Sequence, residues 1–329
     1  MSAGARRVLV IGSSGQDGSI LIEHASRVGD MIVGLDASGL VFIGDAARWG
    51  SPPPTADIEV PRSMEALVSW GRFDEVYYLA AHHTSSDEAG ASMCDPTTWH
   101  RSWSVHCQGL VHTLNALAGH APTARLVYAS SCLAFGDVDV APQTESTPLC
   151  PIGPYGVTKA AGMGICASYR ARGLHASVAI LYNHESPRRR PGFVTQRVAR
   201  AVASAVHDGG QRVMFRVKDP EAVVDWISAE DAVRALRAIA ASDAGGAFVV
   251  AGGRARSVRE LCEAAAAHRG LAAEIVQEGE KAMGRKAPLI GDAGRLHRMT
   301  GWEPRVTFET WVGQMVDAAI AAGPSWGQS

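Results

Sequence analysis

The sequence has 329 residues but contains no long hydrophobic run and no excess of charge of either sign. Because a membrane-spanning helix needs about 20 consecutive apolar residues, the sequence predicts none, and it shows no secretory signal pattern. The net charge is −2 and charged residues make up 19% of the chain, which argues against a basic surface for nucleic acid. We therefore expect a soluble, cytoplasmic protein that binds neither membranes nor nucleic acid.

Paired cysteine motifs are also missing. The six cysteines are scattered along the chain, and no two of them are separated by only two residues. Zinc sites and disulfide frameworks depend on regular cysteine spacings, so the sequence predicts no metal site and no disulfide scaffold. This usage fits a reducing compartment.

Short apolar runs that alternate with helical patterns are the main structural signal. Strands are predicted at residues 7–11, 31–35, 75–79, 125–129, 177–181 and 247–250, and helices at 20–28, 63–70, 99–118 and 158–172. Continuous apolar strands separated by helices indicate a parallel sheet that is covered on both faces. The sequence thus predicts an α/β fold with a Rossmann-type, doubly wound parallel sheet.

After about residue 182 the alternation weakens. A loop rich in proline and arginine precedes predicted helices at residues 193–206, 257–268 and 308–321. We expect a nucleotide-binding domain at residues 1–180 and a smaller C-terminal α/β substrate-binding region at 181–329, partly interleaved with the first.

A glycine-rich turn follows the first predicted strand and precedes a helix. It reads Gly12-Ser13-Ser14-Gly15-Gln16-Asp17-Gly18. Glycines at such a turn let the backbone approach a pyrophosphate, which binds at the helix N-terminus. The turn therefore predicts a dinucleotide site formed by Gly12, Ser14, Gly15, Gln16, Asp17 and Gly18.

Asp36 ends the next predicted strand, about 20 residues after the glycines. A carboxylate at that position accepts hydrogen bonds from the adenosine ribose hydroxyls and repels a 2′-phosphate. No arginine follows it directly, because the next residues are Ala37, Ser38 and Gly39. The sequence accordingly favours NAD over NADP as the cofactor.

Tyr155 and Lys159 form a Tyr-x-x-x-Lys pair. In a helix, residues four apart share one face. An ammonium beside a phenol favours the phenolate and is expected to lower the pKa of the tyrosine, so that it exchanges protons near neutral pH. This arrangement suits hydride transfer at a carbinol, during which one group must handle the hydroxyl proton.

With these motifs the chain resembles the extended short-chain dehydrogenase/reductase superfamily, and within it the GDP-mannose 4,6-dehydratase branch. The resemblance runs through most of the chain. It rests on the Gly15–Ser19 turn, Leu79-Ala80-Ala81, Ala129-Ser130-Ser131, Pro154–Lys159, Tyr182-Asn183-His184-Glu185-Ser186-Pro187-Arg188-Arg189, Phe193-Val194-Thr195, Asp225-Trp226 and Gly301-Trp302-Glu303-Pro304.

The resemblance implies roles for matched positions. Ser131 would hydrogen-bond the reacting sugar oxygen beside Tyr155, and Lys159 would hold the nicotinamide ribose. The implied cofactor contacts also include Asp57, Ile58, Leu79, Ala80, Ala81 and Tyr182. The implied substrate contacts are His82, Asn183, Glu185, Arg188, Val194 and Arg197. Relatives often carry an arginine before the Asp-Trp pair, but this chain has Val224 there. The candidate replacements are Lys218, Arg216 and Arg285.

One departure bears directly on the chemistry. In the dehydratases a glutamate lies two positions after the serine or threonine that acts with the tyrosine and lysine. This glutamate removes the proton beside the transient C4 ketone. This chain has Leu133 at that position. A leucine cannot move a proton, and loss of general-base catalysis costs a factor of order 10²–10⁴ in rate. The chain thus keeps the groups for oxidation but lacks the usual group for elimination.

Two other residues are candidates for the missing base. Cys132 lies next to Leu133, and a thiolate acts as a base when its neighbours lower its pKa. His83 follows the predicted strand at 75–79, at the sheet edge where ligands of such folds bind. Each also has an ordinary structural interpretation, as a buried apolar thiol and as a packed or solvated imidazole.

The leading hypothesis is an NAD-dependent epimerase of a nucleotide-linked sugar, with GDP the favoured nucleotide, that acts through a 4-keto intermediate. That cycle needs only Ser131, Tyr155 and Lys159. The alternatives are a 4-keto-sugar reductase, a 4,6-dehydratase with a relocated base, and a non-catalytic NAD-binding sensor. The resemblance further implies a homodimer formed through the helices predicted at 99–118 and 158–172.

Overall fold

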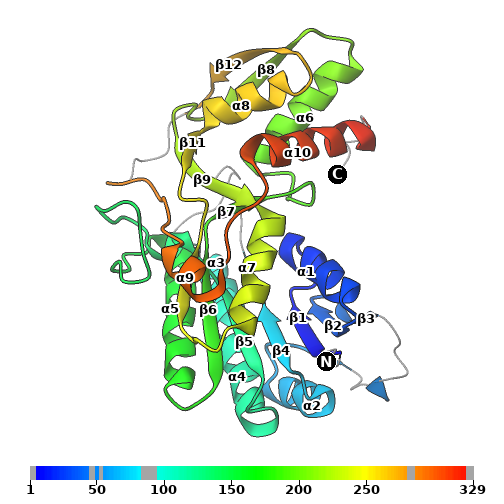
Figure 1. Ribbon diagram of the computed structural model, residues 1–329, viewed down its shortest axis with the longest axis vertical. Coiled ribbons are helices and arrows are strands. Elements are labelled where there is room, and N and C mark those ends of the chain that lie inside the picture. Colours follow the sequence, from blue (N-terminus) through cyan, green and yellow to red (C-terminus); the bar gives the residue numbers. More distant parts are fainter. Residues whose placement is uncertain (1–4, 44–48, 52–54, 83–94, 280–285, 324–329) are drawn as a thin grey trace.

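The computed structural model describes residues 5–43, 49–51, 55–82, 95–279 and 286–323. Its larger body is built on a seven-stranded sheet with the strand order β10-β6-β5-β4-β1-β2-β3 (Figure 1). Every pairing in this sheet is parallel except that of β3 with β2. The strands are β1 (Arg7–Ile11), β2 (Met31–Asp36), β3 (Gly39–Ile43), β4 (Glu75–Tyr78), β5 (Arg125–Ser131), β6 (His175–Leu181) and β10 (Ala247–Val250).

Helices cover both faces of this sheet, as the apolar strands require. Successive residues of β1 alternate between two separate core clusters, with Val8 and Val10 on one face and Leu9 and Ile11 on the other. One face packs against α1 (Gln16–Arg27), α7 (Ala229–Ala241) and α9 (Gly294–Thr300). The other packs against α2 (Pro61–Gly71), α4 (Gly109–His120) and α5 (Gly153–Arg170). The predicted Rossmann-type α/β fold is therefore confirmed.

The strand order also determines where a ligand binds. β1 lies between β2 and β4, so the chain reverses its direction of winding beside β1. In open α/β sheets the crevice at the carboxyl ends of such neighbouring strands is the ligand site. The predicted residues Gly12, Asp36, Leu79 and Ser131 all lie at the carboxyl ends of β1, β2, β4 and β5.

A second body lies at the opposite end of the long axis (Figure 1). It contains α6 (Val194–His207), α8 (Val258–Ala267), α10 (Phe308–Ala322) and the two-stranded sheet of β8 (Arg212–Val217) and β12 (Ala272–Gln277), which share a third core cluster. A three-stranded sheet of β7 (Asn183–Glu185), β9 (Val223–Ser228) and β11 (Ala255–Ser257) completes the fold.

Segments from the predicted C-terminal region belong to the large body. β10 pairs with β6 in the large sheet, and α7 packs on the same sheet, although both follow residue 181. The expected helix at residues 99–118 is divided into α3 (Pro96–Trp103), a single π-helical turn (Ser104–Gln108) and α4. The domain boundary at residue 180 stays a prediction.

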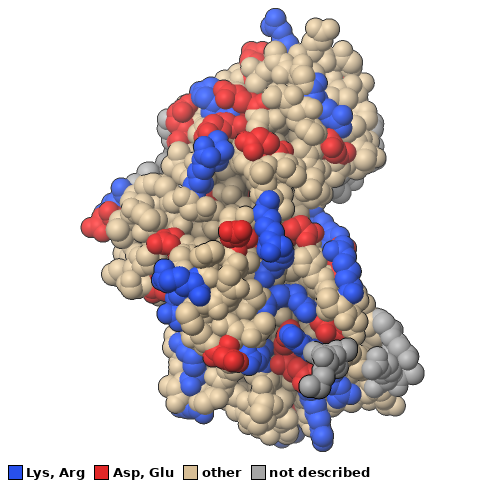
Figure 2. All heavy atoms as spheres, viewed as in Figure 1, with Lys and Arg blue, Asp and Glu red and all other residues tan. Residues whose placement is uncertain are grey.

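The charges on the surface agree with the balanced composition. Figure 2 shows Lys and Arg mixed with Asp and Glu over the face in view. Among the described residues, no helix is both long and apolar enough to cross a membrane.

Candidate active site

The glycine-rich turn leaves no room for side chains. Gly12 has a φ of +91°, and a Cβ there would lie 2.7 Å from the backbone nitrogen of Ala80. A Cβ on Gly18 would collide with the carbonyl oxygen of Gly12. Within the described chain, no side chain caps the start of α1, so its first N–H groups stay available. This close, uncapped turn fits the pyrophosphate of a dinucleotide.

Asp36 lies at the end of β2 with its carboxylate held in place. Oδ1 accepts hydrogen bonds from the Ser38 backbone N–H (2.8 Å) and hydroxyl (2.6 Å), and Oδ2 accepts one from the Ser13 hydroxyl at 3.3 Å. The Ser38 hydroxyl contributes most to lowering the pKa of Asp36 below its ordinary value. An ionised carboxylate at this strand end fits the ribose diol of NAD and disfavours a 2′-phosphate.

The other predicted cofactor residues follow β4, precede α2 or follow β6. Leu79 and Ala80 are half-buried after β4, and Ala81 is exposed. Asp57 accepts a hydrogen bond from the backbone N–H of Glu59, and the Ile58 carbonyl accepts one from His112 Nδ1. Tyr182 is buried, and its hydroxyl donates to Gln143 Oε1 at 2.8 Å. Their contacts with a cofactor stay predictions.

Ser131, Tyr155 and Lys159 come together where β5 ends and α5 begins. Ser131 is the last residue of β5, and its Oγ accepts a hydrogen bond from the Leu133 backbone N–H at 3.2 Å. Tyr155 lies in the first turn of α5 and interacts with the Ser131 hydroxyl. Lys159 lies one turn later, is 1% exposed, and places Nζ 5.6 Å from the centroid of the Tyr155 ring.

The expected effect of Lys159 on Tyr155 is not what the structure shows. Burial raises the pKa of Tyr155 above its ordinary value, and the groups that lower it are Arg189 and the Ser131 hydroxyl. Burial also lowers the pKa of Lys159 to about 7. The Lys159 Nζ donates to the Ala129 carbonyl at 2.6 Å. Removal of water from both groups therefore outweighs the attraction between ammonium and phenolate.

The three residues after Ser131 form a 3₁₀ turn, Cys132–Ala134. Leu133 is half-buried beside the Ser131 hydroxyl. Cys132 is 4% exposed and belongs to the core cluster on that face of the sheet. A thiol shielded in this way is poorly placed to exchange protons with solvent. Its assignment as a base stays a prediction, and His83 lies outside the described residues.

The sequence motifs assigned no role to His184, yet this residue links the glycine-rich turn to β7. Its Nδ1 lies 2.7 Å from the Tyr182 carbonyl and its Nε2 lies 2.9 Å from Asp17 Oδ2. Both oxygens can only accept, so both ring nitrogens carry protons and His184 is an imidazolium. Although burial lowers it, the net pKa of His184 is raised, chiefly by Asp17. Adjacent to this pair, Gln16 Nε2 donates to the His184 carbonyl at 3.0 Å.

Arg189 was also missed. Its guanidinium carbon lies 3.6 Å from the centroid of the Phe193 ring, and its Nε lies 3.4 Å from Glu185 Oε2. Its charge lowers the pKa of Tyr155. The signal for both residues was the Asn-His-Glu-Ser-Pro-Arg-Arg string, within which only Asn183, Glu185 and Arg188 were assigned roles from the sequence.

The predicted substrate residues have varied surroundings. Glu185 is buried and accepts a hydrogen bond from the Thr195 hydroxyl at 2.7 Å. Arg188 turns onto α1, where it pairs with Glu23 and donates to Ser19 Oγ at 3.0 Å. His82 is half-buried, and burial is the largest cause of its lowered pKa.

Asn183 begins β7, and Val194 and Arg197 lie in the first turn of α6. Arg285 lies outside the described residues, and the substrate assignments stay predictions.

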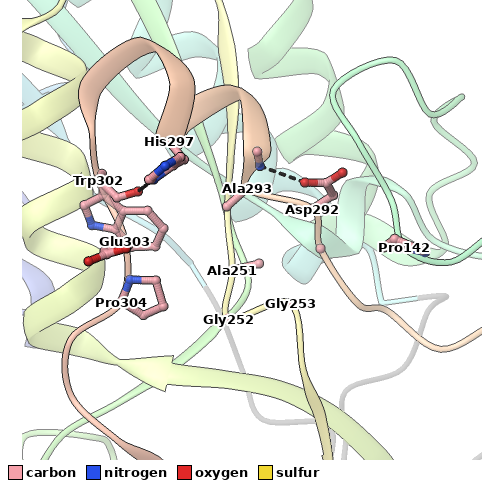
Figure 3. Close-up of a pocket in the computed structure, with 12 residues that line it drawn as sticks. Pro142, Ala251, Gly252, Gly253, Asp292, Ala293, His297, Trp302, Glu303 and Pro304 are labelled. Atoms are coloured by element: carbon pink, nitrogen blue, oxygen red, sulfur yellow. Dashed lines mark hydrogen bonds between the residues drawn. The ribbon is translucent and has the colours of Figure 1, made fainter.

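A separate cavity of about 310 Å³ opens between the loop after β10 and the segment around α9 (Figure 3). In Figure 3, Asp292 accepts a hydrogen bond from the Gly294 N–H, and His297 Nδ1 contacts the Trp302 carbonyl. No predicted site residue is among the described residues that line it. Within the described ranges, no group of three or more His, Cys, Asp or Glu side chains could hold a metal ion.

Comparison with known proteins gives a consistent result. The family model described as GDP-mannose 4,6 dehydratase matches residues 9–315. The GDP-mannose 4,6-dehydratase sdnI of Sordaria araneosa is 31% identical over 94% of this chain, which spans about 60% of that protein's length. The GDP-mannose 4,6 dehydratase of Drosophila melanogaster is 30% identical over 95% of this chain and 85% of its own.

Solved structures agree in fold. RMD from Pseudomonas aeruginosa, complexed with NADPH, matches with a TM-score of 0.80 at 24% identity, over 97% of this chain and 100% of its own. The UDP-glucose 4-epimerase of Thermus thermophilus, in complex with NAD, matches with a TM-score of 0.76 at 24% identity, over 96% and 99% of the two chains. The resemblance predicted from the sequence is therefore confirmed.

Proposed function

The chain belongs to the GDP-mannose 4,6-dehydratase family, and from that premise we propose that it is an NAD-dependent nucleotide-sugar epimerase. The observation that carries the proposal is the pairing of a complete Ser131, Tyr155 and Lys159 set with Leu133 at the position of the family's base. A set that oxidises a carbinol but cannot withdraw the neighbouring proton is suited to reversible oxidation at C4.

The cofactor assignment rests on two features of the crevice. The turn has no room for a side chain at Gly12 or Gly18, so its backbone can lie close to a pyrophosphate. Asp36 presents an ionised carboxylate to the adenosine ribose. When bound, NAD supplies a hydride acceptor that can return the hydride to the sugar. Relatives of the same fold are complexed with NADPH or NAD, and Asp36 supports NAD for this chain.

The protein's own groups handle the proton. Tyr155 would take the hydroxyl proton of the sugar as its C4 is oxidised, and Ser131 would hydrogen-bond the same oxygen. Arg189 and Ser131 favour the ionised form of Tyr155, against the effect of burial. If the 4-keto sugar turns before the hydride returns, the C4 configuration inverts and no atom is lost.

Family membership favours a GDP-linked substrate. We propose that Asn183, Glu185, Val194 and Arg197 contact its nucleotide. The same assignments apply if a UDP- or dTDP-linked sugar is the substrate, so the nucleotide must be determined by experiment.

The test is to incubate the purified protein in heavy water with GDP-mannose and with UDP- and dTDP-linked hexoses, and to analyse the products by mass spectrometry and NMR. We expect an epimer of unchanged mass with no deuterium on carbon and no net consumption of NAD. The Tyr155→Phe variant, which keeps the ring, is the matched control and should be inactive. Accumulation of a dehydrated 4-keto-6-deoxy sugar would refute the epimerase proposal, and stoichiometric oxidation of NADH by a 4-keto sugar would identify a reductase instead.

A further inference from the structure

A histidine to which neither the sequence motifs nor the proposed mechanism assigns a role lies directly against Tyr155. His106 is 0% exposed. Its ring is perpendicular to the Tyr155 ring, with an interplanar angle of 90° and the centroids 5.3 Å apart. An edge-to-face contact of this kind is attractive and restricts how the two rings can turn. His106 therefore borders the phenol that the proposed reaction depends on.

The backbone around His106 is unusual. It belongs to the π-helical turn Ser104–Gln108 between α3 and α4. Such turns are rare and occur frequently at functional sites. Two strand tyrosines hold the turn on the sheet: the Tyr78 hydroxyl donates to the Val105 carbonyl at 2.6 Å, and the Tyr128 hydroxyl lies 3.4 Å from the His106 carbonyl. The ring is thus carried on an anchored segment.

The hydrogen bonds of His106 define its protonation state. The backbone N–H of His82 donates to His106 Nε2 at 3.0 Å, and because an N–H can only donate, Nε2 carries no proton. The proton of the neutral ring must then be on Nδ1, which lies 2.7 Å from Thr158 Oγ1. The Thr158 hydroxyl donates its own proton to the Pro154 carbonyl at 2.7 Å. The directions of all three hydrogen bonds are therefore determined.

This chain of hydrogen bonds joins two parts of the site. It starts at His82, in the loop after β4 that borders the dinucleotide crevice. It ends at Pro154 and Thr158, which flank Tyr155 in the first turns of α5. One buried imidazole thus connects the backbone of the proposed cofactor site with the helix that carries the phenol.

We infer that His106, as the neutral tautomer protonated on Nδ1, is a positioning residue that holds Tyr155 in line with the cofactor crevice. The inference rests on the proposed function for its kinetic consequence, since it assigns Tyr155 the proton transfer. His106 itself moves no proton, because both of its nitrogens are engaged within the protein. A displacement of the phenol by about 1 Å would cost roughly 10²-fold in rate.

The tautomer can be tested without any substrate. The full-length protein, labelled with ¹⁵N in histidine and loaded with NAD, is studied by long-range ¹H–¹⁵N NMR at pH 7, and the His106→Phe spectrum assigns the signals. We expect His106 to show a protonated Nδ1 and a bare Nε2. A protonated Nε2, or a doubly protonated ring, would overturn the inference even if the protein proves to be an epimerase.

The positioning role is tested by kinetics on the sugar nucleotide that the wild-type enzyme converts. His106→Phe keeps an aromatic ring but removes both hydrogen bonds, and Thr158→Val removes the hydroxyl at nearly constant size. We expect each to lower kcat by about 10- to 100-fold, with KM and the Kd for NAD within about threefold of wild type. Thr158→Ser, which keeps the hydroxyl, should restore kcat.

The double variant separates positioning from general damage. If both residues act through one chain of hydrogen bonds, His106→Phe combined with Thr158→Val should be little worse than His106→Phe alone. A loss of activity that follows the fraction of unfolded protein, or a rise in KM that matches the fall in kcat, would show a merely structural role. If the wild-type enzyme converts no sugar nucleotide, the proposed function fails, and the NMR result alone decides the tautomer.

Discussion

At the scale of single residues, the sequence predicted which candidate catalytic side chains lie together better than it predicted their electrostatics. Tyr155 and Lys159 were predicted from their spacing and Ser131 from the family resemblance, and the three residues lie together in the structure. The prediction that the pKa of Tyr155 is lowered was wrong, because burial raises it. Burial depends on how strands and helices pack around a residue, and a local sequence pattern does not reveal this packing. His106 was missed for a similar reason, since its partners His82 and Thr158 are distant in sequence.

Leu133 gives the most direct residue-scale prediction. Leu133→Glu places a carboxylate beside Ser131, where the family's base would be, and should produce a dehydrated 4-keto-6-deoxy sugar from GDP-mannose at a rate at least about tenfold above background. The product is measured by its mass and by its keto absorbance in alkali.

The matched control for this change is Leu133→Gln, which has nearly the same size and polarity but cannot take up a proton. If the glutamate and glutamine variants form the same amount of dehydrated product, the loss of a base at residue 133 does not explain the chemistry of this chain.

Lys159 predicts a pH dependence of stability. Its pKa is about 7 when folded and near 10.4 when unfolded, so between these values the unfolded chain binds more protons and stability rises with pH. The destabilisation is complete below pH 7 and disappears near pH 10. Lys159→Met should therefore raise Tm relative to wild type by several degrees more at pH 6 than at pH 9, while it abolishes turnover.

Differential scanning calorimetry at the two pH values measures this difference. The conservative control is Lys159→Arg, which keeps a charge that does not titrate in this range, so its Tm relative to wild type should fall as the pH rises. A Lys159→Met effect of the same size at both pH values would contradict the buried, titrating lysine.

At the scale of elements, apolar periodicity predicted the six parallel strands of the large sheet to within one or two residues. The short strands β7 and β11 form only through pairing with β9, so a local sequence pattern does not predict them. Two other misses had a signal. β8 alternates between exposed and buried residues, and Ser228 caps the start of α7, since its hydroxyl accepts a hydrogen bond from the Glu230 N–H.

The turn from β1 to α1 gives an element-scale prediction. Gly18→Ala puts a methyl group against the Gly12 carbonyl, so the turn must open. The Kd for NAD, measured by isothermal titration calorimetry, should rise at least about tenfold.

Gly119→Ala is the control, because a Cβ in that turn of α4 meets no described atom within 4 Å. It should leave the Kd for NAD unchanged and add up to about 1 kcal/mol of stability. Equal NAD affinities in the two variants would show that the turn does not hold the pyrophosphate.

At the scale of the whole molecule, the exposed end of α3 is a candidate surface for self-association. Trp103, at the end of α3, is 53% exposed, which is unusual for a tryptophan. α3 contacts α5, and these helices lie in the region where the family resemblance implies the dimer. We propose a homodimer that covers Trp103.

Sedimentation velocity tests this proposal. The wild-type protein should sediment as a dimer, and Trp103→Glu should weaken self-association at least about tenfold. Val28→Glu changes a residue that is 65% exposed at the end of α1 and should have no effect. A monomeric wild type, or equal behaviour of the two variants, would exclude this interface.

The late position in the sequence of β10 and α7, which belong to the large body, has a consequence for synthesis. β10 pairs at the edge of the large sheet and α7 packs on its face, yet both emerge from the ribosome only after the residues before Ala229. Until then the backbone edge of β6 is unpaired and the apolar surface beneath α7 is exposed to solvent, which favours association between nascent chains. A fragment truncated at residue 180 should therefore precipitate or bind chaperones, whereas a chain extended past β10 can pair the edge of β6 and cover that surface.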